Sequence, residues 1–183
     1  MAMDCSSIHF SGLTIRPYGD RDAEAFTAAV LESVDTVGRW MPWCSAAYNT
    51  GDALAWFADC RNKYGAGAAY EYGIFCQDTG QFLGGAGLND INRQHGLCNL
   101  GYWVRQSAQG RGIAARCVQA LSMHAFQTLG LHRVEIVVAV GNSASERVAI
   151  KAGALHECVA RNRLLIRDES VSAHVFSLVP DRA

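Results

Sequence analysis

The sequence predicts an α+β fold, in which helices cover both faces of a mixed sheet. Helical periodicity dominates the first third of the chain, strands with short connections occupy the middle, and helices alternate with strands in the last third. The 183 residues are enough for one domain that buries about 70% of the surface exposed by the unfolded chain. We therefore expect a single domain over residues 1–183.

The first third begins with a short strand followed by a helix. Residues 13–16 favour the strand. Asp20 can cap the helix, which is expected to run to about residue 34 because apolar side chains recur at helical spacing. These side chains are Ala23, Phe26, Val30 and Val34.

A loop separates this helix from a second one. Residues 40–43 read WMPW, and the proline breaks the helical pattern, which predicts a turn or loop. The second helix starts near Thr50 or Asp52. Its apolar face is expected to consist of Leu54, Trp56 and Phe57.

Three strands follow, over about residues 70–76, 82–89 and 98–105. A turn at residues 78–80, which read DTG, joins the first two. Short connections can join only antiparallel neighbours, because a parallel pair needs a long crossover. The middle of the chain therefore predicts an antiparallel meander.

The last third contains the clearest helix of the chain. From Gln109 the apolar positions repeat every 3.6 residues, and Gly130 supplies the stop. The apolar stripe consists of Ile113, Cys117, Val118, Leu121, Ala125 and Phe126. Residues 134–140 are nearly all apolar, which is typical of a central strand covered on both faces. The remaining elements are a helix over residues 143–152 and strands near residues 155–160 and 171–178.

The start of the long helix is a candidate anion site. Residues 109–114 read QGRGIA, and two glycines let the backbone turn tightly and expose its amides. The helix N-terminus adds a partial positive charge, so a phosphate can bind there without a ring of lysines. Arg111 adds a charge-assisted contact or lies in solvent. Taken alone, the same pattern also describes an ordinary turn followed by a helix start.

This loop also satisfies the relaxed dinucleotide fingerprint G-x-G-x-x-G/A, from Gly110 to Ala115. That fingerprint belongs to parallel βαβ units and requires an acidic residue after the next strand. Here the loop follows an antiparallel meander, and the next strand ends in AVGN at residues 139–142 without an acid. A nucleotide-binding Rossmann fold therefore fits poorly, and the Walker pattern is absent.

Composition limits the classes of partner and the compartment. Sixteen Lys and Arg against seventeen Asp and Glu give a net charge of -1, which provides no electrostatic footprint for nucleic acid or an anionic membrane. The seven cysteines lack a C-x-x-C pair, so we expect reduced thiols and no metal site. Neither a targeting segment in residues 1–10 nor a membrane span of about 20 apolar residues is recognisable. These features predict a cytoplasmic protein.

Three segments resemble the GNAT superfamily of N-acetyltransferases. The loop matches its pyrophosphate pattern Q/R-x-x-G-x-G/A from Gln109 to Ala114. LGYWV at residues 100–104 and NSAS at residues 142–145 are similar to the branch of ribosomal-protein and protein N-terminal acetyltransferases. The resemblance covers about residues 13–179. It implies a mixed, mostly antiparallel GNAT-type sheet flanked by helices, acetyl-CoA as co-substrate without a metal, and an amine acceptor.

The resemblance also implies site roles. Residues of the loop would bind the pyrophosphate, and they are Gln109, Gly110, Arg111, Gly112, Ile113 and Ala114. The pantetheine arm would lie between two splayed strands ending at Val104 and Val140, touching Trp103 and Val104 mainly through their backbone. Asn142 would bind this arm, and Ser145 would sit near the sulfur as the catalytic hydroxyl. Alternatively, Asn142 or Ser143 caps the helix, with Ser143 and Glu146 forming a capping box.

The sequence departs from its relatives at several positions. Many of them carry a tyrosine at the position of Ala149, whereas the serine-bearing branch matches Ser145. Several carry a glutamate at the position of Asn99, and Ala154 replaces a common phenylalanine, which concerns local packing. Glu71, Asp90 and His95 remain as candidate bases, and none is assigned.

Without an obvious base, the acceptor is expected to be an α-amine. An α-amino group with a pKa of about 7.7 to 8.0 is roughly a tenth neutral near pH 7, whereas a lysine near 10.4 is neutral only about four parts in ten thousand. The expected acceptor is a protein N-terminus, such as that of a ribosomal protein. A small amine or a peptide antibiotic remains an alternative, as does a non-catalytic acyl-CoA sensor.

Aromatic residues near the break between the first two helices are candidates for the acceptor wall. They include Trp40, Trp43 and Tyr48, together with Met41. In the resembled superfamily this region borders the acceptor cleft. The same residues are also compatible with an ordinary core or with a homodimer contact, which is common in this branch.

Overall fold

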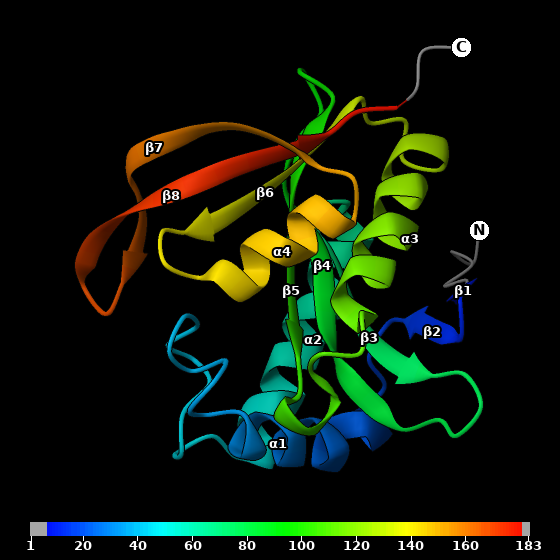
Figure 1. Cartoon of the computed structure of the whole chain (residues 1–183). Helices are drawn as coiled ribbons and strands as arrows, with labels where there is room; N and C mark the ends of the chain where they lie inside the picture. The colour runs from blue at the N-terminus through cyan, green and yellow to red at the C-terminus, as the bar shows by residue number, and fades with distance from the viewer. Residues whose placement is uncertain (1–6, 181–183) are drawn as a thin grey trace.

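The computed structural model describes residues 7–180 and contains one continuous sheet with helices on both faces (Figure 1). The strands are β1 (Ile8–Phe10), β2 (Leu13–Arg16), β3 (Tyr70–Cys76), β4 (Phe82–Asn92), β5 (Leu97–Val104), β6 (Arg133–Ala139), β7 (Leu155–Ile166) and β8 (Glu169–Leu178). They pair in the order β1-β2-β3-β4-β5-β6-β8-β7. All neighbours are antiparallel except β5 and β6, which confirms the predicted mixed, mostly antiparallel sheet.

Two pairs of helices cover the sheet. The helices α1 (Ala23–Glu32) and α2 (Thr50–Ala66) pack on one face, against β4 and β3 respectively. The helices α3 (Ile113–Gln127) and α4 (Ser143–Lys151) pack on the other, as Figure 1 shows. Each face has its own apolar cluster, one rich in aromatic rings beneath α1 and α2, and a larger aliphatic one beneath α3 and α4. The predicted α+β architecture is thus confirmed.

The starts of the first two helices depend on different residues than expected. The prediction that Asp20 caps α1 is wrong, because a 3₁₀ turn (Asp20–Asp22) precedes that helix and Asp20 accepts a hydrogen bond from Arg61 at 2.8 Å. The second helix begins at Thr50 as predicted, and its cap is Asn49, whose Oδ1 accepts hydrogen bonds from the amides of residues 51 and 52. Such a cap satisfies amides that have no intrahelical acceptor.

The expected apolar face of α2 is only partly correct. Phe57 is fully buried, but Leu54 is 40% exposed. The buried face consists of Ala53, Phe57 and Cys60, which follow one another at helical spacing. Trp56 lies between the two faces and is partly buried. The buried stripe passes through Ala53 instead of Leu54, a difference of one residue or about 100° around the helix.

The meander of β3, β4 and β5 forms as predicted, although β4 continues to Asn92, three residues beyond its expected end. Its glycines allow close strand contact: a Cβ on Gly84 would lie 2.2 Å from the carbonyl oxygen of Trp103. The strand β1 was not predicted, because three residues give too short a pattern to recognise. It pairs with β2 through a turn in which Ser11 and Gly12 both have positive φ.

The strand β6 is less buried than its apolar sequence suggests. Val134, Ile136 and Val138 are buried beneath α3 and α4, whereas Glu135 and Val137 between them are partly exposed. The expectation of a strand covered on both faces is therefore wrong. A run of apolar residues does not by itself show how many faces are covered.

The strands β7 and β8 form a hairpin much longer than expected, and it projects from the body of the molecule in Figure 1. Its polar stretch at residues 160–163 carries a bulge, with Asn162 at φ 51°. This irregularity interrupts the alternation that identifies a strand in the sequence. Arg167 at the hairpin turn donates a hydrogen bond to the carbonyl of Gly38 at 2.7 Å.

The structure also shows the state of the cysteines and the character of the helices in the described residues. Six cysteines of the described region, at positions 44, 60, 76, 98, 117 and 158, carry free thiols, while Cys5 lies outside the described residues. None of the helices in residues 7–180 has both the length and the apolar character needed to cross a membrane. Across the same residues, no cluster of three or more His, Cys, Asp or Glu side chains could hold a metal ion.

Candidate active site

The sheet opens between β5 and β6. Their parallel pairing is limited to Leu97–Asn99 against Arg133–Glu135, so the rest of β5 up to Val104 has no partner strand on this side. On its other side β5 pairs with β4 as far as Val104. The main-chain groups on the unpaired edge of β5 are therefore available to a ligand that runs between the two strands.

The loop of residues 109–114 lies immediately beyond this open edge. Gly110 and Gly112 have φ values of +78° and +71°, a conformation that favours glycine. Gly112 is the N-cap of α3, and no side chain caps this helix. Its first amides consequently have no intrahelical acceptor and form, with the helix dipole, a place where an anion can bind. The helix begins at Ile113 rather than at Gln109, because residues 109–112 form this loop.

The polar side chains of the loop are engaged in holding it. Gln109 Nε2 donates to the carbonyl of Val104 at 3.0 Å and to Thr36 Oγ1 at 3.2 Å. Arg111 Nη2 donates to the carbonyl of Ser107 at 2.9 Å. Ile113 and Ala114, the first two residues of α3, are buried. An anion at this loop would therefore be bound mainly by its backbone amides.

An ion pair fixes the segment that leads into the loop. Glu32, the last residue of α1, accepts hydrogen bonds from the Arg105 guanidinium and from both the amide and the hydroxyl of Ser107. These bonds hold the pKa of Glu32 well below its usual range, at about 2, with the Arg105 hydrogen bond as the main cause. The position of the loop therefore depends on a carboxylate located more than seventy residues earlier in the chain.

Lys151 is a cation at this site that the sequence analysis missed. It is the last residue of α4, and its Nζ lies 3.5 Å from the point where a Cβ on Gly112 would stand. An ammonium group at this distance can reach an anion bound at the start of α3. Nothing in its local sequence indicates this role, because the contact depends on how α4 packs beside α3.

Asn142 caps α4, as one of the two alternatives predicted. Its Oδ1 accepts a hydrogen bond from the amide of Ser145 at 3.2 Å. The proposed capping box between Ser143 and Glu146 is not formed, and Glu146 instead lies 3.6 Å from His174. The cap turns the first residues of α4 toward the opening between β5 and β6.

The hydroxyl of Ser145 contacts that of Tyr102 across this opening, with Oγ and Oη 2.9 Å apart. The Tyr102 hydroxyl also lies 3.1 Å from the carbonyl oxygen of Ser145. Burial raises the pKa of Tyr102 to about 12, so this hydroxyl stays protonated at neutral pH and can donate a hydrogen bond. Tyr102 lies within the GYWV segment used for the resemblance, but its role was not predicted.

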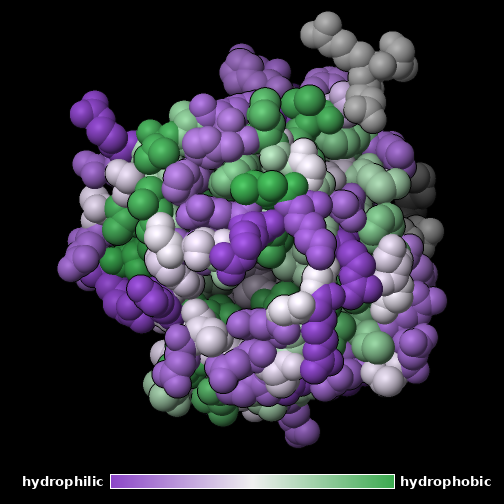
Figure 2. Space-filling view, in the orientation of Figure 1, coloured by the Kyte–Doolittle hydropathy of each residue, from purple (hydrophilic) through white to green (hydrophobic). Residues whose placement is uncertain are grey.

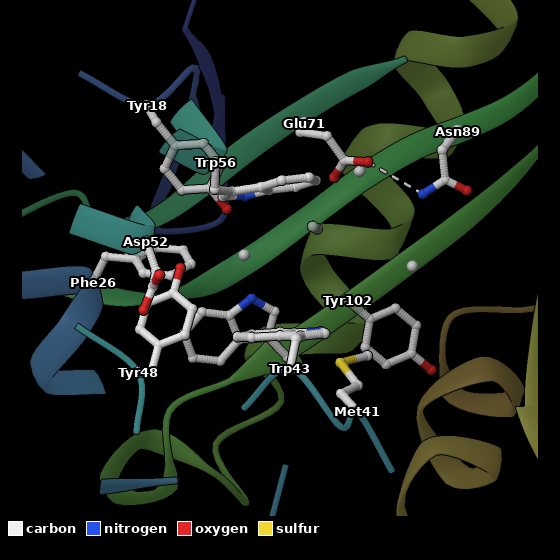
Figure 3. Close-up of a pocket in the computed structure, with 15 residues that line it drawn as sticks. Tyr18, Phe26, Met41, Trp43, Tyr48, Asp52, Trp56, Glu71, Asn89 and Tyr102 are labelled. Carbon is white, nitrogen blue, oxygen red and sulfur yellow. Dashed lines mark hydrogen bonds between the residues drawn. The ribbon is translucent and has the colours of Figure 1, made fainter. Parts of the chain in front are cut away.

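A cavity of about 440 Å³ lies on the α1–α2 face, and its lining extends to Tyr102. In Figure 2 the molecule is hollowed near its centre, with hydrophilic side chains along most of the rim. Figure 3 shows Trp56 and Glu71 along one side of the cavity, Tyr48 and Trp43 along the other, and Met41 beside Tyr102. Gly85, Gly87 and Gly101 contribute to its lining without side chains.

The predicted acceptor wall is brought together only in part. Trp43 and Tyr48 line the cavity, and their rings lie 6.1 Å apart. The Trp43 ring also contacts that of Trp103, at 5.5 Å between centroids. Trp40 is not part of this lining, and its ring lies beside Gly141, in the turn between β6 and α4. Trp56 from α2 lines the cavity and was expected only as a core residue.

Glu71 brings a carboxylate into the cavity from β3. Asn89 Nδ2 donates a hydrogen bond to its Oε1 at 3.2 Å, and Asn99 in turn donates to Asn89 Oδ1 at 2.9 Å. Burial is the main influence on this group and raises the pKa of Glu71 above its usual value. Of the three bases considered from the sequence, Glu71 lines this cavity, whereas Asp90 and His95 do not.

Comparison with known proteins identifies the class. Residues 12–155 match the acetyltransferase (GNAT) domain, and the chain belongs to this family. It is therefore an acyltransferase, with the GNAT fold that the sequence predicts.

Individual relatives include proteins named for ribosomal substrates. YdaF of Bacillus subtilis, provisionally named a ribosomal N-acetyltransferase, is 28% identical over 170 residues, which are 91% of each chain. The ribosomal-protein-serine acetyltransferase of Escherichia coli is 29% identical over 115 residues, 63% of each chain. Among solved structures, the ribosomal L7/L12 α-N-protein acetyltransferase RimL in complex with coenzyme A has a TM-score of 0.87 at 22% identity, covering 96% of this chain and 99% of the other.

Proposed function

We propose that this chain transfers an acetyl group from acetyl-CoA to the α-amine of a protein N-terminus. The observation that carries the proposal is the position of the aromatic cavity. It runs from the helices α1 and α2 to Tyr102, whose hydroxyl meets Ser145 at the opening between β5 and β6. An acceptor bound in the cavity would thus have its amine beside the strand edge at which a thioester would lie.

The residues around the opening fit coenzyme A. The uncapped start of α3 and the positive φ values of Gly110 and Gly112 suit a pyrophosphate, with Lys151 as a nearby cation. The unpaired edge of β5 near Trp103 and Val104 suits the amide-containing pantetheine arm. Gln109 and Arg111 would act by fixing the loop. Ile113 and Ala114 would contribute backbone amides, and Asn142 would orient Ser145.

When bound, acetyl-CoA supplies an activated acetyl group with a thiol-like leaving group. The chain's own residues hold the acceptor, exclude water from it and provide hydrogen bonds. The protonated hydroxyls of Tyr102 and Ser145 would donate to the departing sulfur, which needs only modest help because a thiol has a pKa near about 8.5. Ser145 is therefore proposed as a catalytic residue, together with Tyr102.

The α-amine is favoured by its acidity and by the relatives. Near pH 7 an α-amine loses its proton far more readily than a lysine side chain, whose pKa is about 2.5 units higher. Relatives such as the E. coli ribosomal-protein-serine acetyltransferase are named for ribosomal-protein substrates. Trp43, Tyr48 and Trp56 would contact the first side chain of the acceptor, because large rings bury apolar surface efficiently.

A small amine is the second candidate acceptor, and one feature of the cavity favours it. Its lining includes the carboxylates of Asp52 and Glu71 and no lysine or arginine within the described residues. An acidic, aromatic cavity of about 440 Å³ also suits a compact cationic molecule. A polyamine, an aminoglycoside or a peptide antibiotic would belong to this class.

Release of coenzyme A thiol from acetyl-CoA distinguishes these acceptors. The enzyme is incubated with peptides of varied N-terminal residue, with polyamines and with aminoglycosides. The proposal predicts the highest kcat/KM for a peptide, whereas a preference for a small amine favours the second candidate. Thermal denaturation with coenzyme A or NAD provides a separate check, because only coenzyme A should raise the Tm.

The chain would act as one acetyltransferase domain in the cytoplasm, where its free cysteines stay reduced. A homodimer also remains part of this proposal. Sedimentation analysis at several protein concentrations tests it directly.

A further inference from the structure

We infer that Glu71 is the residue that receives the acceptor's ammonium group and takes its proton. The inference deepens the proposed function, on which it rests, by assigning the base that the sequence left open. Its basis is the place of this carboxylate over Gly87, next to the open space over the paired Gly101, on the floor of the cavity.

Three residues on adjacent strands form a row across this floor. Glu71 on β3 is paired with Gly87 on β4, and Gly87 is paired with Gly101 on β5. Paired residues of antiparallel strands point to the same face, so all three belong to the face that carries the cavity. The cavity lining includes each of them.

The Glu71 carboxylate lies directly over Gly87. A Cβ at Gly87 would stand 1.8 Å from Glu71 Oε2 and 2.2 Å from its Cδ, so a side chain there would displace the carboxylate. Around Gly101, by contrast, no atom other than those of Gly101 and its two chain neighbours lies within 4 Å of the corresponding point. The row thus consists of a carboxylate over one glycine and open space over the next.

That open space can admit an amine. Neighbouring strands lie about 4.8 Å apart, so a nitrogen above Gly101 would be about one strand spacing from the carboxylate over Gly87, within reach of a hydrogen bond after a small shift. Gly101 directly precedes Tyr102 on the unpaired part of β5, where the thioester is proposed to lie. An amine at this point would have Glu71 on one side and the acetyl group on the other.

Glu71 is held in place without being neutralised. The Asn99–Asn89 hydrogen-bond chain fixes one oxygen, and no Lys or Arg of the described residues forms an ion pair with this carboxylate. In Figure 3 the carboxylate faces the cavity beside Trp56, with its bond to Asn89 drawn as a dashed line. A partly buried carboxylate without a cationic partner is suited to bind an incoming cation.

The surroundings raise the proton affinity of Glu71. Burial raises its pKa, the hydrogen bond from Asn89 and the charge of Lys63 lower it, and Asp59 and Asp90 raise it. Tyr18 and Cys60 also interact with this carboxylate. Arg61 and Tyr64 line a smaller cavity on its other side, and Asp52 lies in the main cavity. Because Glu71 borders both cavities, a proton accepted in one can leave through the other.

The proton balance of the step is complete. The ammonium R–NH₃⁺ gives one proton to the Glu71 carboxylate and becomes R–NH₂. Its nitrogen forms a bond to the acetyl carbon, the carbon–sulfur bond breaks, and the sulfur leaves with that electron pair. The nitrogen then loses its second proton, which ends on the sulfur as a thiol, and Glu71 releases the first proton to water.

The variant Glu71→Gln tests this role, because glutamine retains the shape and an oxygen for the Asn89 hydrogen bond. We expect kcat/KM for the peptide acceptor to fall at least about 100-fold at pH 6.5. The loss should shrink at pH 9, where the amine is already neutral. The Tm increase caused by coenzyme A should be unchanged. A pH profile and kcat/KM that coincide with those of the wild type would overturn the inference.

Two further variants make the result specific. Gly87→Ala displaces the carboxylate without removing it and should reduce kcat/KM in the same pH-dependent way. Glu24→Gln is the matched control, since Glu24 is an exposed carboxylate on α1 outside the cavity, and it should retain wild-type kinetics. A Gly87→Ala enzyme with wild-type kinetics and a coenzyme A response would contradict the placement. Failure of the proposed function can be distinguished from failure of this inference, because the wild-type enzyme itself would then acetylate neither a peptide nor a small amine.

Discussion

The hydroxyl of Tyr102 on β5 lies 2.9 Å from that of Ser145 in the first turn of α4. This bond spans the place where β5 and β6 no longer pair, and it joins Tyr102, which lines the aromatic cavity, to the helix capped by Asn142. Both hydroxyls therefore lie where we propose that the thiol departs. The relationship depends on the splayed strands and on the cap together.

The first prediction concerns these two hydroxyls. Ser145→Ala and Tyr102→Phe should each lower kcat by about 10-fold or somewhat more, because each removes one donor to the departing sulfur. The decrease in kcat should be smaller than that expected for loss of an acid that a poor leaving group requires, because a thiol leaves readily. Stopped-flow or steady-state thiol release measures kcat, and calorimetry should give a coenzyme A Kd within about twofold of the wild type. An unchanged kcat in both variants would remove the pair from the mechanism.

The second prediction concerns the anion site at the start of α3. Lys151→Ala should raise the Kd for coenzyme A by about 3- to 10-fold, the effect of losing one charge-assisted contact of roughly 1 kcal/mol. The difference should narrow at high ionic strength because salt screens this contact. Arg163→Ala, which removes an exposed cation on the β7–β8 hairpin, serves as the control and should leave Kd unchanged. Equal Kd values for the Lys151 variant and the wild type at low salt would be inconsistent with a phosphate contact.

The third prediction separates the two roles of Asn142. Asn142→Ala should lower the free energy of unfolding by about 1 kcal/mol because it removes the cap of α4, whereas Asn142→Asp should retain most of that stability. Ser143→Ala should have little effect, since the Ser143–Glu146 capping box is not formed. Urea denaturation gives these values. A higher KM for acetyl-CoA in the stable Asn142→Asp enzyme would indicate an additional contact between the amide and the pantetheine arm.

The fourth prediction follows from the Glu32–Arg105 ion pair. The pKa of Glu32 is lowered in the folded protein to about 2 from an ordinary value of 4.5, so its contribution to stability is complete above pH 4.5 and lost as the pH falls toward 2. The difference in unfolding free energy between the wild type and Glu32→Gln should therefore be largest near neutral pH and shrink over this window. Denaturation curves at pH 7, 4.5 and 3 would show it. A difference that stays constant with pH would mean that the charge of Glu32 is unimportant.

Much of the fold was predictable because it depends on local patterns. The amphipathic stripe of α3, the stop at Gly130 and the short turns of the meander all lie within a few residues of the elements they define. The prediction that Asp20 caps α1 is wrong because residue types that cap helices are also common at turns. Only the packing of α2 shows that Asp20 pairs with Arg61. The predicted hairpin is too short because the bulge near Asn162 breaks the alternation of apolar and polar residues in β7.

The candidate site was predictable where a motif is continuous in sequence. The glycine loop and the Asn142–Ser145 segment are such motifs. Lys151, Tyr102 and Glu71 belong to the site through contacts across the sheet, and only strand register and helix packing bring them there. The sequence offers Glu71 as a candidate base. Only the strand register shows that Gly87 lies opposite it on the next strand.

Mass spectrometry of a matched pair of peptides shows whether the enzyme acetylates an α-amine. Both contain the same internal lysine, and one has a free N-terminus while the other has a blocked one. After incubation with the enzyme and acetyl-CoA, we expect one acetyl group on the free α-amine and none on the blocked peptide. Acetylation of the lysine in both peptides would show that the α-amine is not the acceptor. Acetylation of a small amine but of neither peptide would show the same.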